Sequence, residues 1–437
     1  MKNYKKSLLT SMFACSLFLN AFAQTSPFAG GSGTKKDPYL IETPRQFDAI
    51  RDYRDKNFKL NADLDFTGYL REDGGTWWPV GEWGSGDNAA ERFSGTFNGN
   101  GHKIKNLVVE RTASDLSIFG VTDGAQISNL IVEGCEITGE GRLGVLTGAT
   151  FRTEIDQVAV INSKCLNTLS DHGSNAGGIT GPLFAGSTIT NSYSIGGKVF
   201  GKDAIGGVCS QINDGSTISN CYTTCDVEGN TNVGGITGNT NGGYILNSVA
   251  INTAITCHDV NDGRIAGTVN GSNLLSNNYA YRYTTVNGGV NGEMVTDVSV
   301  NAKNGANATE DELTSVSFYA TNLTWDIAAD NSTVWKVDAT IFKYPVLSWQ
   351  TEGPGSGIVN VEEQNANKYK VFVIGNSVVV NNLQANDDVS VYSLSGTLVG
   401  RSKAINSTES IPVTNNGLYV VKIASQGQSY IFKAIKR

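Results

Sequence analysis

The side chains best suited to chemistry in this 437-residue chain are its aspartates and its three histidines. Acid–base cleavage of a polysaccharide requires two carboxyl groups, or carboxylates beside Arg or Lys, held close together. The histidines, His102, His172 and His258, lie far apart, and the sequence has neither a paired-aspartate motif nor the HExxH zinc-peptidase motif. It therefore predicts no catalytic residue, no cofactor and no metal site. The aspartates, which are scattered, are Asp156, Asp203, Asp214, Asp226, Asp259 and Asp262.

Three tryptophans near the N-terminal end, Trp77, Trp78 and Trp83, are candidates for ligand binding. An indole ring offers a large amphipathic face on which a sugar can stack. The alternative is that these rings form the core of a capping segment. The sequence leaves both roles open.

A repeat organises the middle of the chain. The phrase GGITG occurs at residues 177–181 and 234–238, with the near copy GGVCS at 206–210. Ile-x-Asn or a close variant occurs seven times, at steps of 23, 28, 34, 29, 27 and 30 residues. This period indicates a solenoid and is shorter than a propeller blade of about 40 residues. The sequence predicts an all-β fold, a right-handed parallel β-helix of about seven coils whose strands pair with their equivalents one coil away.

Alternation along a strand assigns the inward side chains. If the isoleucine of each phrase points inward, the residue two positions later does too, and the residue between them faces water. The sequence therefore predicts a ladder of buried, paired amides, with Gln157 as the exception. The glycine pairs are expected where a Cβ would crowd the neighbouring coil. The ladder comprises Asn106, Asn129, Asn191, Asn220, Asn247 and Asn277.

The longest interval between phrases is the one of 34 residues from Ile155 to Ile189. Its excess falls near residues 166–176, so Asp171 and His172 are expected to project on a loop. Loops on a rigid scaffold often carry recognition, which makes these two residues candidates for ligand binding. The alternative is a tolerated insertion without a role.

The first residues indicate export. Three lysines, a short apolar run and Ala21-Phe22-Ala23 predict a secretory signal peptide over residues 1–23. The formal net charge of −8 becomes −11 without those lysines, which disfavours nucleic acid and anionic lipid as partners. No later stretch is apolar and long enough for a membrane helix. The six remaining cysteines match no zinc pattern, and buried free thiols are favoured over disulfides.

Both ends of the predicted β-helix carry helix signals. Thr43 to Gln46 forms a capping signature with proline at the first helical position, and Thr309 to Glu312 begins a second short helix. After Trp349 a polar Gly/Pro-bearing stretch precedes short alternating strands, typical of a small β-sandwich. The predicted domains are a signal peptide (1–23), an N-terminal cap (24–100), β-helix repeats (101–290), a C-terminal cap (291–350), a linker (351–368) and a C-terminal β-sandwich (369–437).

The repeat phrases resemble the GLUG motif, found in bacterial surface proteins and beside the peptidase domain of some IgA proteases. The similar stretches are LGVLTG (143–148), AGGITG (176–181), IGGVCS (205–210) and VGGITG (233–238), with RIAGTV (264–269) as a degenerate copy. With the leader GSGTKKDPYLIETPRQF and a closing segment that contains KYPVLSW, the likeness covers residues 28–350. It implies a β-solenoid at the cell surface. It implies no reaction, because these repeats are a scaffold.

Residues 369–437 resemble the C-terminal sorting domain of the type IX secretion system of Bacteroidetes. The stretches VYSLSGTLV and GLYVVKI and the basic ending Lys433 to Arg437 carry this likeness. It implies that the type IX secretion machinery is a partner of the chain.

Taken together, the sequence favours a secreted or surface-displayed β-helix that acts as an adhesion or binding module for glycans or for host or matrix ligands, and not an enzyme. Two alternatives stay open. One is a polysaccharide lyase or hydrolase built on a β-helix, and the other is a purely structural component of the cell surface.

Overall fold

The computed structural model describes residues 26–84, 89–169, 173–272, 274–287, 295, 298–339, 341–353, 369–374, 377–393, 397–414, 417–425 and 428–436. The predicted signal peptide and most of the predicted linker lie outside these residues. The chain separates into two compact units, Met1–Thr351 and Glu352–Arg437.

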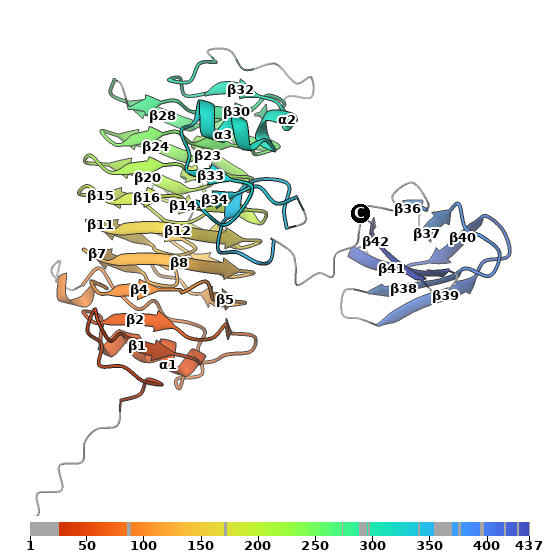
Figure 1. Cartoon of the computed structure of the whole chain (residues 1–437), viewed down its shortest axis with the longest axis horizontal. Helices are drawn as coiled ribbons and strands as arrows, with labels where there is room; N and C mark the ends of the chain where they lie inside the picture. The colour runs from red at the N-terminus through yellow and green to blue at the C-terminus, as the bar shows by residue number, and fades with distance from the viewer. Residues whose placement is uncertain are drawn as a thin grey trace, which may run out of the picture. The chain divides into compact units, whose positions relative to one another are not determined.

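The first unit is a parallel β-helix, as predicted, with its coils stacked along one axis (Figure 1). Within the described residues its largest sheet has sixteen strands. They are β1 (Tyr39–Ile41), β2 (Asn57–Leu60), β3 (Leu64–Asp65), β4 (Thr96–Asn98), β5 (Lys103–Lys105), β8 (Gln126–Glu133), β12 (Glu154–Ile161), β16 (Thr188–Thr190), β17 (Tyr193–Ile195), β21 (Thr217–Ser219), β22 (Tyr222–Thr223), β25 (Tyr244–Leu246), β26 (Val249–Ala250), β29 (Leu275–Ser276), β30 (Tyr279–Tyr281) and β32 (Ala306–Ala308).

Two further sheets complete each coil. The second contains β6 (Val108–Glu110), β9 (Glu136–Gly139), β10 (Arg142–Gly144), β13 (Lys164–Asn167), β14 (Asn175–Gly177), β18 (Lys198–Phe200), β19 (Asp203–Gly206), β23 (Asp226–Gly234), β27 (Ala254–Gly263) and β31 (Thr285–Val286). The third contains β7 (Val121–Asp123), β11 (Ala149–Phe151), β15 (Leu183–Phe184), β20 (Cys209–Asn213), β24 (Thr237–Asn241) and β28 (Ala266–Asn270).

Columns of isoleucine hold the coils in register. Ile155 pairs with Ile189 of the next coil, Ile189 with Ile218, and Ile218 with Ile245. All four side chains are fully buried. Full burial of such a side chain stabilises the fold by about 1.5–3 kcal/mol, so each coil junction gains from the same column.

The glycine pairs allow neighbouring coils to approach closely. A Cβ on Gly178 would lie 1.9 Å from the carbonyl oxygen of Gly207 in the next coil, a distance that excludes any side chain. In the degenerate RIAGTV copy Arg264 takes the equivalent place. Arg264 is fully buried and donates to the carbonyl oxygens of Asn304 and Gly305, and burial lowers its pKa to about 10. The column formed by the second glycine of each pair therefore ends at this coil, while the column formed by the first glycine continues at Gly263.

The asparagine column lies at a corner of the coil and not inside the barrel. Asn220 is half-buried and has a φ of 53°, a left-handed conformation that asparagine adopts more readily than most residues. β21 ends at Ser219, so the alternation of inward and outward side chains along the strand does not extend to Asn220. The prediction that these amides are buried inside the β-helix is therefore wrong. The same conformation recurs at Asn106, Asn129, Gln157, Asn191, Asn247 and Asn277.

Some of these amides nevertheless pair from coil to coil. Asn220 Nδ2 donates to Asn191 Oδ1 at 3.3 Å, and Asn277 Nδ2 donates to Asn247 Oδ1 at 2.8 Å. Asn191 Nδ2 donates to a carboxylate instead, Asp156 Oδ1, at 2.9 Å. The ladder is therefore not made of amides alone, because at one coil the carboxylate of Asp156 accepts the hydrogen bond.

All six cysteines of the described residues are free and buried. Burial raises the pKa of the Cys135, Cys165 and Cys209 thiols to about 12. These thiols fill the interior as small apolar side chains.

The closing segment, expected as an end cap, also covers an outer face of the coils. We call residues 309–350 the strap; it contains α2 (Glu310–Leu313), α3 (Val316–Asn322), β33 (Ile327–Ala328), β34 (Trp335–Lys336) and β35 (Val346–Leu347). Figure 1 shows it running from the last coil back to the middle of the stack. Trp325 Nε1 donates to the Asn247 carbonyl oxygen at 2.8 Å, and Trp349 Nε1 donates to Gln157 Oε1 at 3.0 Å.

The strap packs there because this outer face is apolar. Tyr193 and Tyr222 of successive coils stack with ring centroids 5.0 Å apart, and both are fully buried. Trp335 of the strap is fully buried against them, 6.0 Å from each ring. The Tyr222 hydroxyl donates to the Pro345 carbonyl oxygen at 2.7 Å. Covering this face is the physical reason for the departure from a simple end cap.

The second unit confirms the small C-terminal β-sandwich. One antiparallel sheet contains β36 (Lys370–Ile374), β37 (Ser377–Asn381) and β40 (Thr408–Pro412), and the other contains β38 (Asp388–Ser393), β39 (Leu398–Lys403), β41 (Gly417–Ser425) and β42 (Gln428–Lys436). Val378 of the first sheet and Val389 and Val421 of the second belong to one buried cluster.

Candidate functional site

The loop of residues 66–84, which follows β3, carries all three candidate tryptophans, and we call it the tryptophan loop. It lies beside α1 (Pro44–Asp48) and η1 (Ala49–Asp52); η2 (Ala89–Glu91) follows it in the chain. Two pockets adjoin the loop, of about 420 Å³ and about 320 Å³, and Trp78 and Glu82 line both.

Two arginines hold the backbone of the tryptophan loop. Arg51 of η1 donates through Nη1 to the Pro79 carbonyl oxygen at 3.1 Å and through Nη2 to that of Trp78 at 2.9 Å. Arg111, which follows β6, donates through Nη2 to the Thr76 carbonyl oxygen at 2.6 Å. Because the loop is fixed from both sides, its exposed side chains are positioned before any ligand arrives.

Trp77 belongs to the core. It is 1% exposed, its Nε1 donates to the Ile118 carbonyl oxygen at 3.0 Å, and its ring packs 5.2 Å from that of Phe47. Of the two roles left open for Trp77, packing in the core of the cap is therefore the one that holds, and the candidate binding role is wrong because a buried ring cannot contact a ligand. It anchors the loop instead.

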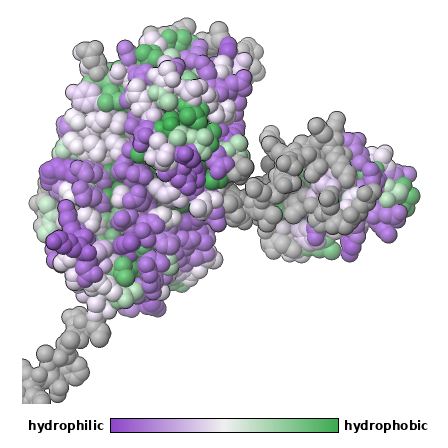
Figure 2. Space-filling model, viewed as in Figure 1, coloured by the Kyte–Doolittle hydropathy of each residue, from purple (hydrophilic) through white to green (hydrophobic). Residues whose placement is uncertain are grey.

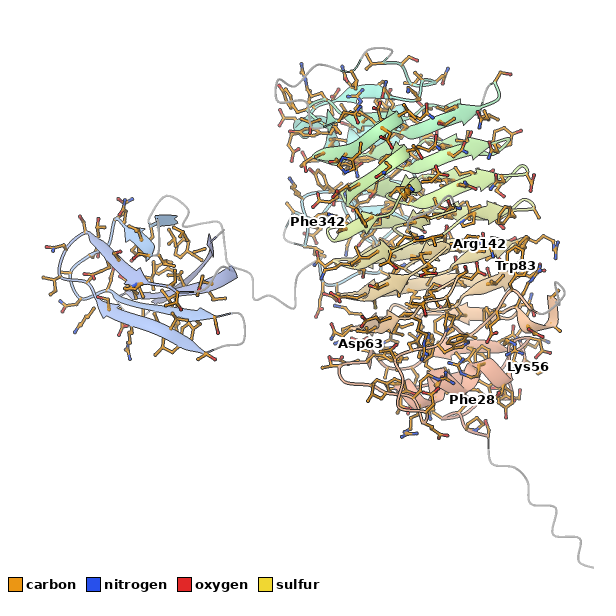
Figure 3. The ribbon with its side chains drawn as sticks, turned by 180° about the vertical axis from the view of Figure 1, so that it is seen from behind. Phe28, Lys56, Asp63, Trp83, Arg142 and Phe342 are labelled. Atoms are coloured by element: carbon orange, nitrogen blue, oxygen red, sulfur yellow. The ribbon has the colours of Figure 1, made fainter. Side chains whose placement is uncertain are left out.

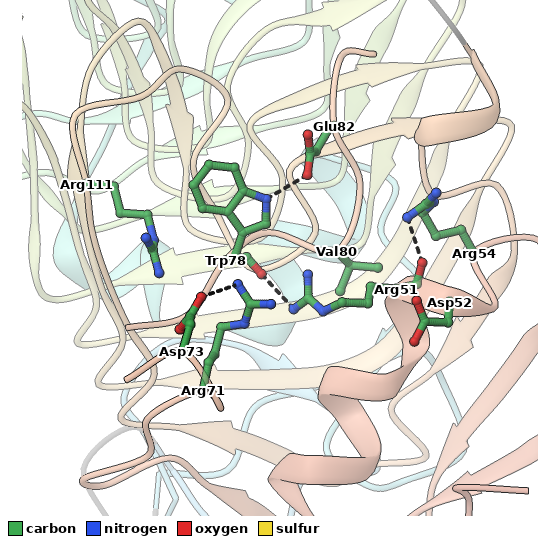
Figure 4. A pocket seen from close by; sticks show the side chains of 9 residues that line it. All are labelled: Arg51, Asp52, Arg54, Arg71, Asp73, Trp78, Val80, Glu82 and Arg111. Carbon is green, nitrogen blue, oxygen red and sulfur yellow. Dashed lines mark hydrogen bonds and ion pairs between the residues drawn. The ribbon is translucent and has the colours of Figure 1, made fainter. Parts of the chain in front are cut away.

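Trp78 points the other way and stays half-buried at the boundary of the two pockets. Its Nε1 donates to Glu82 Oε1 at 2.7 Å, which fixes the orientation of the ring. The guanidinium of Arg111 lies 4.9 Å from the ring centroid, within the range of a cation–π contact. Figure 4 shows Trp78 between Arg111 and Glu82.

The larger pocket is rich in charge. Four arginines and three carboxylates line it with Trp78 and Val80. The pKa of Asp73 is lowered by a hydrogen bond from the Gly75 backbone, with Arg71 and Arg111 adding to the effect. The lining is positive by one charge in a chain of net charge −8. The charged residues are Arg51, Arg54, Arg71, Arg111, Asp52, Asp73 and Glu82.

The smaller pocket contains Trp83 and the acidic side chains Glu82, Glu91 and Asp115. Arg142 of the next coil lies over Trp83 at 3.9 Å from the ring centroid and donates through Nη2 to Asp115 Oδ2 at 2.9 Å. Figure 3 shows Trp83 and Arg142 side by side. One face of Trp83 is therefore occupied by a protein cation.

The remaining candidates do not form a site. Asp171 and His172 lie outside the described residues. His102 Nδ1 is 3.1 Å from Asp63 Oδ1, and His258 Nε2 is 3.2 Å from an oxygen of Glu228 in another part of the stack. Among the described residues no group of three His, Cys, Asp or Glu side chains could hold a metal ion.

The sequence analysis missed the arginines of the larger pocket, of which Arg51 lies in η1 and the other three lie in the segments between helices and strands. A compositional signal was present. Six of the twelve arginines of the chain lie between residues 45 and 111, before most of the repeats begin.

No family model matches the chain. Over 174 residues it is 37% identical to a Gly-rich membrane protein of Evansella cellulosilytica, covering 37% of this chain and 19% of that protein. Over 174 residues it is 29% identical to halomucin of Haloquadratum walsbyi, covering 38% of this chain and 2% of that protein. The chain thus spans less than a fifth of the length of these relatives.

Among solved structures, an IgA1 protease matches with a TM-score of 0.39 and 14% identity, over 90% of this chain and 34% of that one. A likeness at this level carries no argument about activity. None of the helices in the described part of the chain has the length and apolarity needed to cross a membrane.

Proposed function

We propose that the chain is a surface-displayed binding module whose β-helix is a scaffold and whose ligand site is the tryptophan loop. The observation that carries this proposal is the placement of Trp78, a half-buried ring on a braced loop, at the boundary of two pockets. An aromatic face beside hydrogen-bonding groups suits a sugar ring, so the ligand class is a glycan.

The outer surface of the coils suits this role less well. Its charged side chains neutralise one another between coils, as in Lys164 with Glu136 at 2.5 Å and Lys198 with Glu228 at 2.6 Å. Four of the seven outward residues of the repeated phrase are small hydroxyl side chains, as in Thr190 and Ser219. Figure 2 shows that hydrophilic residues predominate over the lower part of this face, while hydrophobic residues gather mainly in its upper middle.

Display at the surface is supported by the repeat resemblance and by a matched relative that is named as a membrane protein. The C-terminal β-sandwich has its own core, as a separable sorting domain would need. We expect that deleting residues 358–437 leaves the melting temperature of the β-helix unchanged and keeps the protein from the cell surface. A truncated protein that still reaches the surface would remove the type IX assignment.

A glycan array tests the binding role. The wild-type protein should give discrete signals that Trp78→Ala removes, because the aromatic face is lost. Tyr283→Ala is the matched control, since Tyr283 is an exposed aromatic residue, 65% accessible, on the last coils. No signal for the wild type, or equal loss in both variants, would contradict the proposed site.

A reducing-sugar assay on pectin, hyaluronan and mucin glycans distinguishes a binding module from a polysaccharide lyase or hydrolase. A binding module leaves these polymers intact. Depolymerisation that a single Asp or Arg substitution abolishes would replace the binding role with catalysis.

A further inference from the structure

The larger pocket concentrates arginine in an acidic protein. Two of its four arginines are neutralised in place. Arg51 donates through Nε to Asp48 Oδ1 at 2.8 Å, and Arg71 Nη1 lies 3.5 Å from Asp73 Oδ2 and its Nε 3.8 Å from Asp48. The Tyr69 hydroxyl also donates to Asp48, so this carboxylate is fully engaged.

The other two arginines have no carboxylate partner among the residues that the structure describes. Arg54 donates through Nη1 to the Arg51 carbonyl oxygen at 2.6 Å, and Arg111 donates only to loop carbonyls. The charge of Arg111 helps to lower the pKa of Asp73 without forming an ion pair with it, and each of the two arginines keeps guanidinium N–H groups for a further acceptor. An arginine guanidinium presents paired donors that match the two oxygens of a carboxylate.

Figure 4 shows where these two charges lie. Arg111 and Arg54 stand on opposite sides of the pocket, with Trp78 and Arg51 between them. A cation at each end and an aromatic ring in the middle match a chain of sugars that carries a carboxylate on successive rings. A pocket of about 420 Å³ accommodates a short stretch of such a chain.

We propose that this pocket binds an acidic oligosaccharide, with sugar carboxylates at Arg54 and Arg111 and a sugar ring against the face of Trp78 that Arg111 does not cover. This inference rests on the glycan-binding function proposed above and narrows its ligand class. Asp52 and Glu82 in the lining then disfavour phosphorylated or densely sulfated polymers, because these carboxylates repel a ligand of higher negative charge.

The test uses oligogalacturonate and its fully methyl-esterified form, which share the same rings and differ in the carboxylate charge. Isothermal titration with the full chain should show binding of oligogalacturonate at low salt, weaker binding in higher salt, and binding of the ester at least tenfold weaker. Arg54→Gln should weaken oligogalacturonate binding about tenfold, the loss expected for one charge-assisted hydrogen bond. Arg54→Lys should restore part of it.

Arg282→Gln is the matched control, because Arg282 is an exposed arginine on the last coils, outside the pocket. Equal affinity for the acid and its ester would keep the glycan-binding function and overturn the acidic ligand. Equal weakening by Arg54→Gln and Arg282→Gln would overturn the assignment of the ligand to this pocket.

If glycan-array signals were confined to neutral sugars, the acidic-ligand inference would fail while the proposed glycan-binding function stood. If the protein bound no glycan at all, both would fail. Circular dichroism of each variant verifies that it is folded.

Discussion

The N-terminal region, residues 28–123, and the coils, residues 125–287, share the same three sheets but differ in what their side chains contact. In the coils nearly every side chain faces its equivalent one coil away, about 4.8 Å along the axis. In the N-terminal region short helices and the tryptophan loop lie between the strands of the stack. Its arginines and aromatic rings contact different kinds of residue and not their own equivalents in a neighbouring coil.

The repeat limits which residues a coil position can hold. A coil position must suit the coils on both sides, which favours isoleucine, glycine, asparagine and small outward residues. The N-terminal region has no such constraint on its outer residues. It can therefore hold four arginines around one tryptophan. In the coils, repeating such a position would place like charges next to one another from coil to coil, where they repel.

The stability of the coils should fall most strongly at alkaline pH. All six described cysteines lie in the coils, and burial raises the pKa of three of them from 9 to about 12. Below pH 9 both states keep these thiols protonated, so the stability is fully present. Between pH 9 and 12 only the unfolded chain releases the protons, so the free energy of unfolding falls. Urea unfolding at pH 8 and pH 11 measures this, and an unchanged midpoint would show that the thiols are not buried.

The next prediction distinguishes two reasons for glycine: close packing against the neighbouring coil and a left-handed backbone conformation. Gly178→Ala should lower the free energy of unfolding by about 3 kcal/mol, because its Cβ would meet the carbonyl of the next coil. Gly186→Ala is the matched control, because its φ is 76° and its Cβ would meet nothing within 4 Å. The control should cost about 1 kcal/mol, from left-handed strain alone. Equal costs in chemical denaturation would refute the packing role of the glycine pair.

A smaller effect tests the corner role of the asparagine column. Asn220→Ala should lower the free energy of unfolding by about 1 to 2 kcal/mol, because alanine resists the left-handed conformation. Asn220→Gly should cost clearly less, since glycine adopts that conformation freely. If glycine costs as much as alanine, the hydrogen bond to Asn191 dominates and the amide ladder is the main contribution.

The smallest effect is expected on the coil surface. Ser219→Ala should change the free energy of unfolding by less than about 0.5 kcal/mol and leave glycan-array signals unchanged. Trp78→Ala, the substitution in the tryptophan loop, should remove those signals. A loss of binding in Ser219→Ala would move the ligand onto the coils.

The coils were predictable because their signals are local and periodic. The phrase spacing alone indicates which isoleucines stack and where glycine is needed. The asparagine position was mistaken because a strand alternation was extended one residue past Ser219, into a corner that the pattern does not distinguish from a strand.

The strap and the arginine pocket were beyond such reasoning because their contacts are distant in sequence. Trp349 meets Gln157 across 192 residues, and Arg111 braces a loop 35 residues earlier. Neither contact repeats, so no period reveals it. Trp77 and Trp78 are adjacent and of one type, yet only the folded loop decides that the first is buried and the second lines a pocket.

Amide hydrogen exchange with and without bound oligogalacturonate tests whether the ligand contacts the N-terminal region and not the coils. A binding N-terminal region predicts slower exchange in residues 51–54, in the tryptophan loop and around Arg111, with the coils unchanged. Slower exchange confined to residues 125–287 would contradict it, because the ligand would then lie on the coils.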